Sequence, residues 1–122
     1  MLDDPFEFLA AVQQMQSEWQ EEFNEQLIRI DQLVTSSNVL EALTQGRLYS
    51  GKLQTNVLTM QQALDKVSCI KLSAFIRFTE PWKVEVLQQI VDALTRARDG
   101  FSVMVATLGG RLSDLQILLA RS

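Results

Sequence analysis

The chain has 122 residues, of which 47% are hydrophobic and 21% charged, and these values are typical of one ordinary globular domain. It contains no histidine and one cysteine. This composition excludes Ser-His and Cys-His nucleophile pairs, histidine-bearing zinc sites and thiolate metal clusters within one chain. We therefore expect no catalytic residues, no cofactor and no metal site.

The net charge of -4 is unevenly distributed along the chain. Nine acidic side chains and one basic side chain occur through Glu41, whereas six acidic and ten basic side chains follow it. This pattern predicts an acidic first helix beside more basic later helices, a pairing that helps to set orientation. The basic residues are spread along the chain and the pI is about 4.7, so nucleic-acid binding is not expected.

Targeting signals are weak in this sequence. No apolar run approaches the roughly 18 residues of a membrane span, and the N-terminus opens with Asp3 and Asp4 instead of basic residues. We expect no integral membrane segment, and a location that is cytoplasmic or reached by export without a standard signal peptide. The single Cys69 lies in an apolar segment, and we interpret it as an inert buried thiol.

The first helix is predicted over residues 5–34. Asp4 is placed to cap it, Pro5 occupies the first helical position and Glu7 the third, from which it can reach back to the cap. Apolar residues then recur at steps of three and four along one face. These residues are Phe8, Val12, Met15, Trp19, Phe23, Leu27, Ile30 and Val34.

The second helix is predicted over residues 38–68, after a turn at 35–38 made of residues that bond their own backbone. Asn38 and Glu41 have the spacing of a capping box. The apolar seam continues at Val39, Leu43, Gly46, Ser50, Leu53, Val57, Met60, Leu64 and Val67. Either the helix continues and Gly46 with Ser50 forms a notch, or the chain breaks near Gly51; the unbroken seam favours the notch.

The third helix is predicted over residues 81–108, because Pro81 marks a restart. The preceding segment, residues 68–79, fits a helix extension or an irregular connector. The seam of the third helix passes Gly100 unbroken, but Gly109-Gly110 is a stronger helix breaker, and Arg111 falls on the seam immediately after it. The seam residues are Leu87, Ile90, Leu94, Ala97, Phe101, Met104, Leu108, Leu115 and Leu118. We expect a kink or interruption at one of these sites and a final helical piece at 112–120.

The predicted fold is therefore all-α: an antiparallel bundle of three to four long amphipathic helices with coiled-coil-like packing, forming a single helical-bundle domain over residues 1–122. The large apolar residues outside the seams are more than three helices would readily cover. Among them, Phe75, Ile76, Phe78 and Trp82 are the candidate protein-binding residues, because aromatic side chains dominate binding patches. The alternative is that they pack under the connector as a small satellite core.

The opening Asp4-Pro5-Phe6 ahead of a long amphipathic helix resembles the N-terminal three-helix domain of some syntaxins over these three residues. Secretion chaperones share the small, acidic, helical composition. These likenesses imply an accessory protein of secretion or trafficking.

Three functional hypotheses follow from the sequence. The first is a non-enzymatic bundle that acts through protein contacts, as an adaptor, a chaperone-like protein or a structural subunit, with another protein or a second copy as partner. The second is a bundle that binds a small molecule or lipid in the notch at Gly46 and Ser50. An enzyme is the weakest of the three, because catalytic residue types are so sparse.

Overall fold

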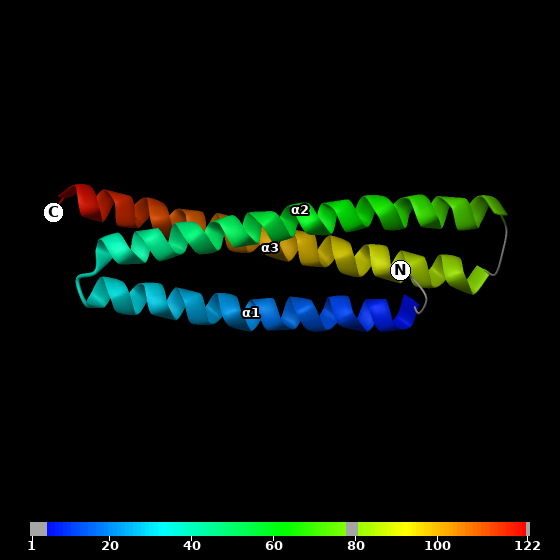
Figure 1. Cartoon of the computed structure of the whole chain (residues 1–122), viewed down its shortest axis with the longest axis horizontal. Coiled ribbons are helices and arrows are strands. Elements are labelled where there is room, and N and C mark those ends of the chain that lie inside the picture. Colours follow the sequence, from blue (N-terminus) through cyan, green and yellow to red (C-terminus); the bar gives the residue numbers. More distant parts are fainter. Residues whose placement is uncertain (1–4, 78–80, 122) are drawn as a thin grey trace.

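The computed structural model describes residues 5–77 and 81–121, with side chains described for residues 6–69 and 85–121. It contains three helices, α1 (Pro5–Thr35), α2 (Val39–Arg77) and α3 (Pro81–Arg121). Figure 1 shows them side by side along the length of the molecule, with each helix running opposite to the one before it. The contact between α2 and α3 is the most extensive, and α1 packs on both. The predicted all-α fold is confirmed.

Helix α2 is continuous through Gly46 and Gly51 and extends to Arg77. The segment at 68–77, for which helix and connector were both open, is therefore helical. No described glycine has a positive φ, so neither glycine ends the helix. Each interior glycine costs about 1 kcal/mol relative to alanine, and burial of Leu43 and Leu53 on either side outweighs that cost at roughly 1.5–3 kcal/mol per side chain.

The expected interruption of the third helix is wrong, because α3 runs from Pro81 to Arg121 without a break. Gly109 and Gly110 both have helical geometry in it. Buried Met104 and Leu108 precede the glycine pair, and buried Leu115 follows it on the same face. Packing of this seam holds the backbone helical where local propensity alone favours a stop.

The turn between α1 and α2 closes with two backbone hydrogen bonds that define a helix C-terminal motif. The Asn38 amide donates to the Leu33 carbonyl at 2.8 Å, and the Ser37 amide donates to the Val34 carbonyl at 3.0 Å. Ser37 has a φ of 67°, the left-handed conformation that this Schellman arrangement requires. The Asn38 carbonyl then accepts from Ala42, so α2 begins directly after it. Glu41 accepts a hydrogen bond from Gln45 Nε2 at 3.3 Å, within its own helix.

The core follows the predicted seams closely. The most deeply buried large side chains come from all three helices and are Ile30, Leu53, Ile90, Leu94, Phe101 and Leu108. In the middle of the bundle, Trp19 meets Phe101 edge-to-face at 5.7 Å between ring centroids, and Phe23 stacks on Tyr49 at 6.4 Å. Such aromatic pairs contribute about 0.5–1.5 kcal/mol beyond their burial.

Two positions of the predicted α3 seam are not core. Arg111 is half-buried and forms a surface ion pair with Asp31 of α1. Leu118 is exposed, although Leu115 one turn earlier is buried. The seam of α3 is therefore longer than the surface that α1 and α2 offer to it.

Candidate functional site

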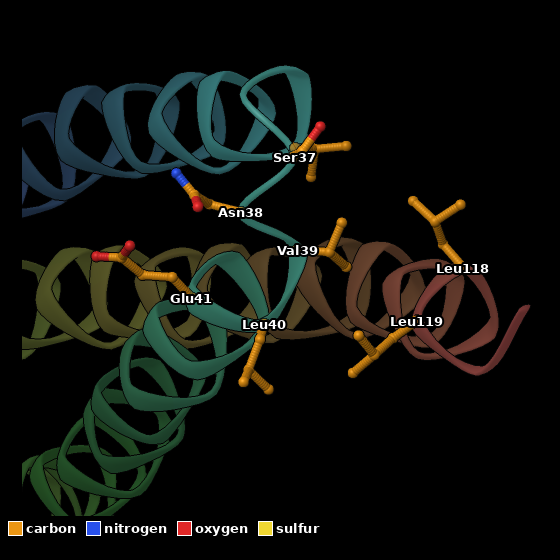
Figure 2. A pocket seen from close by; sticks show the side chains of 8 residues that line it. Ser37, Asn38, Val39, Leu40, Glu41, Leu118 and Leu119 are labelled. Atoms are coloured by element: carbon orange, nitrogen blue, oxygen red, sulfur yellow. The ribbon is translucent and has the colours of Figure 1, made fainter. Parts of the chain in front are cut away.

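An open groove of about 600 Å³ lies at the turn end of the bundle. It lies between the turn that joins α1 to α2 and the C-terminal end of α3. Figure 2 shows Leu119 at the end of α3 pointing toward the start of α2, where Val39 and Leu40 lie, whereas Leu118 points in the opposite direction to Leu40. The lining residues are Val34, Ser37, Asn38, Val39, Leu40, Glu41, Leu118 and Leu119.

The apolar residues of this groove are exposed because α3 reaches past the other helices. Figure 1 shows the C-terminal end of α3 beside the turn and extending beyond the start of α2. Leu118 and Leu119 continue the core side of α3, but they are 45% and 37% exposed, and Leu40 is 64% exposed. The bundle thus ends on uncovered leucine side chains at the floor and rim of a concave surface.

A second hollow of about 250 Å³ adjoins the groove between α1 and α3. Val34 lines both, and the other lining residues of the second hollow are Ile30, Asp31, Arg111, Asp114 and Leu115. Arg111 Nη1 donates to Asp31 Oδ1 across it, with both side chains more than one-third exposed. A solvent-exposed pair of this kind contributes roughly 0–1 kcal/mol to stability, so it orients α1 on α3 more than it stabilises the fold.

Gly46 lies where the three helices converge beneath this end of the bundle. A methyl group on its Cα would overlap Cδ2 of Leu112 in α3 and lie 3.6 Å from Cδ1 of Ile30 in α1. Gly46 is buried, whereas Ser50 is half-buried and its hydroxyl accepts a hydrogen bond from Gln54 at 3.3 Å. The close helix contact is thus made at Gly46, and the Leu112 side chain occupies the space that a ligand would need there.

The four candidate protein-binding residues fall outside the part of the chain whose side chains the structure describes. Phe78 lies outside the described residues, as do the side chains of Phe75, Ile76 and Trp82. The assignment of a binding patch to these four residues stays a prediction. Cys69, expected to be buried, is exposed.

Tyr49 is the most perturbed titratable group among the described residues. Its side chain is buried between α1 and α2, and its hydroxyl has no hydrogen-bond partner among the described residues. Burial, reinforced by the nearby Glu22 carboxylate, raises the pKa of Tyr49 to about 12. A phenol in this state stays protonated at neutral pH, which suits a core position and not a catalytic base.

Helix α3 is also unusually apolar. Within Glu85–Arg121, an 18-residue window has a mean hydropathy of 1.3, enough by length and composition to cross a membrane, and 17% of that window is buried. Charged residues interrupt every 18-residue stretch of this range, so the window is not an unbroken apolar run. Core helices of bundles meet the same criterion, so this property alone indicates neither a membrane span nor its absence.

The sequence did not single out Leu40, and it placed Leu118 on a core seam. The signal in the sequence that could have indicated the groove was the length of the apolar seams. The seam of α3 continues to Leu118, beyond the level at which the turn ends α1 and begins α2. No protein-family model, curated protein or solved structure matches this chain. Function is therefore inferred from the groove and its charges.

Proposed function

We propose that this protein is a non-enzymatic helical bundle that acts through protein–protein contacts at the groove beside the α1–α2 turn. Its role would be that of an adaptor, a chaperone-like protein or a structural subunit. The observation that supports the proposal is the exposure of Leu40 and Leu118 in a concave surface, at 64% and 45%. The proposal includes coiled-coil-like packing of antiparallel helices, which the spacing of the seams favours.

The physical driving force is burial of leucine side chains that the fold itself leaves in water. Fully burying one such side chain is worth roughly 1.5–3 kcal/mol, and two or three of them at the centre of a contact make a binding hot spot. The groove carries Glu41, and the adjoining hollow carries Asp31, Arg111 and Asp114, so charged groups near the apolar contact can select the orientation of a partner.

The alternative function, binding of a small molecule or lipid beside Gly46, has less support. It required free space beside Gly46, and Leu112 occupies that space. The groove at the turn is open, and its leucine side chains Leu40, Leu118 and Leu119 are 64%, 45% and 37% exposed, which suits one or two side chains of another protein.

The proposal is tested by placing a photo-crosslinking amino acid at Leu40 and, as a control, at Gln62, which is exposed on the same helix. Both variants are irradiated in cells that make the protein. We expect a discrete crosslinked product from position 40 and none from position 62. Absence of a product at position 40, with the variant folded and expressed, would contradict a protein contact at the groove.

A further inference from the structure

The last two turns of α3 present a face that complements itself. Asp114, Ile117, Leu118 and Arg121 follow the spacing i, i+3, i+4 and i+7, which places them on one side of the helix. The four side chains are exposed, Ile117 and Leu118 to 52% and 45%. An acidic group thus stands at one end of the face, two large apolar groups in the middle and a basic group at the other end.

The two charges at the ends of this face have no ionic partner among the described residues. Arg111 forms an ion pair with Asp31, and Arg98 forms one with Asp99. Asp114 and Arg121 take part in no ion pair among the described residues. Asp114 and Arg121 cannot pair with each other within one helix, because seven residues separate them by about 10 Å along the axis. Each charge therefore suits a partner that brings the opposite charge from outside.

We propose that a second copy of this chain occupies the site, with the two α3 ends packed antiparallel about a two-fold axis between Ile117 and Leu118. This inference rests on the proposed function and names its partner. In an antiparallel pair centred there, Ile117 of one copy lies opposite Leu118 of the other, and Asp114 lies opposite Arg121. The two-fold axis produces each of these pairings twice, as an isologous interface requires.

The same arrangement covers the groove. Leu118 belongs both to the face and to the lining of the groove, so the α3 end of the second copy covers the Leu118 side of the groove. Two turns of helix bury less surface than a permanent dimer needs, so the association is reversible and depends on concentration.

The test is sedimentation velocity of the purified full chain over a wide concentration range, for the natural sequence and for three charge variants. Asp114→Arg and Arg121→Asp each place like charges opposite one another, and each should weaken dimerisation by about tenfold or more. The double variant restores opposite charges with reversed sign and should dimerise nearly as well as the natural chain. Asp92→Arg, an exposed change of the same kind earlier in α3, is the matched control and should have no effect.

Circular dichroism of each variant is the control that checks whether the helices remain folded. A chain that stays monomeric at every concentration would overturn the inference, and so would a dimer that is indifferent to the single changes or is not restored by the double change. If the purified chain is monomeric while position 40 crosslinks to a different protein in cells, the second copy is ruled out and the proposed function stands. A crosslinked product of twice the chain mass supports both.

Discussion

At the residue scale, Gly46 shows how a residue without a Cβ allows a side chain of a neighbouring helix to pack closely against the backbone. Its Cα faces Leu112 of α3 and Ile30 of α1, and no larger side chain fits without displacing one of them. Gly51, only five residues later, has nothing within 4 Å of the position a Cβ would take. The two glycines of one helix therefore differ entirely in what they permit.

Replacement of Gly46 by leucine should lower the free energy of unfolding by about 2–3 kcal/mol, because it overpacks a site where three helices meet. Gly51→Leu, the matched control, should be neutral or slightly stabilising, since the side chain enters solvent and the helix loses a glycine. Urea denaturation monitored by circular dichroism measures both. Adding Leu112→Ala to Gly46→Leu should recover part of the loss; no recovery would mean that Leu112 is not the clashing group.

Tyr49 offers a second prediction at this scale, through its unpartnered buried hydroxyl. Tyr49→Phe should raise the free energy of unfolding at neutral pH by about 1 kcal/mol, because it removes a polar group that was desolvated without a hydrogen bond. The aromatic contacts with Phe23 and Trp19 are retained.

The pH dependence of stability tests the same residue. Because the pKa of Tyr49 is raised from 10.0 to about 12 in the folded chain, the unfolded state loses its proton first. The contribution of Tyr49 is therefore constant below about pH 10 and is lost as the pH rises from 10 towards 12. The stability difference between Tyr49→Phe and the natural chain should widen over that interval, and parallel curves would contradict the assignment.

At the element scale, the turn between α1 and α2 depends on a serine in a conformation that favours glycine. Ser37 is the one described non-glycine residue with a positive φ, and two backbone hydrogen bonds hold it there. The left-handed conformation costs a residue with a Cβ roughly 1–2 kcal/mol. The turn is therefore set by backbone hydrogen bonding at some conformational cost.

Ser37→Gly should raise the free energy of unfolding by about 0.5–1 kcal/mol, since the relieved strain exceeds the added entropy of the unfolded chain. Ser36→Gly is the matched control and should lower stability, because Ser36 has no positive φ and its hydroxyl donates to the Gln32 carbonyl at 2.9 Å. Thermal unfolding of both variants gives the comparison. A loss of stability in Ser37→Gly would show that the serine side chain contributes to the turn.

Helix α3 gives a further prediction at this scale. Gly109 and Gly110 lie in the helix with nothing within 4 Å of either Cβ position. Each change to alanine should therefore add about 0.5–1 kcal/mol of stability, with the two effects adding approximately. Denaturant unfolding measures the gain. A loss on either change would indicate that α3 needs flexibility at this pair, as the local sequence suggests.

At the scale of the whole molecule, the ends of the three helices do not coincide. Helix α1 has 31 residues, α2 has 39 and α3 has 41, so a bundle of these helices leaves part of the longer ones uncovered. At the turn end, the uncovered part is the leucine-rich end of α3. The axial register of α3 against α1 and α2 is thus the origin of the candidate site.

If a second copy covers this end, the Tm of the protein should rise with protein concentration, because association stabilises the folded chain by mass action. Addition of salt should reduce the concentration dependence, since the Asp114 and Arg121 pairs lie at a solvent-exposed rim. Differential scanning calorimetry at several concentrations measures both effects. A Tm independent of concentration would argue against association under those conditions.

Much of the fold could be predicted from residue periodicity, because helices bury one stripe and the stripe is visible in the sequence. The seam from Leu43 to Val67 lies in the core, apart from half-buried Ser50 and Val57. The interruption expected near Gly109 does not occur. Each glycine destabilises the helix by about 1 kcal/mol, which is less than the stabilisation from burying Leu108 and Leu115. The groove could not be predicted, because it depends on where neighbouring helices end relative to α3.

The sequence by itself determined the helical class, the faces that pack, the site of the first turn and the absence of histidine chemistry. These follow from spacing and composition, which are local properties of the chain. Only the tertiary structure decided that Leu112 meets Gly46, that Arg111 meets Asp31, and that Leu118 is left in water. Each of those outcomes depends on the axial register of one helix against another, and register is fixed by the packing of all three helices together.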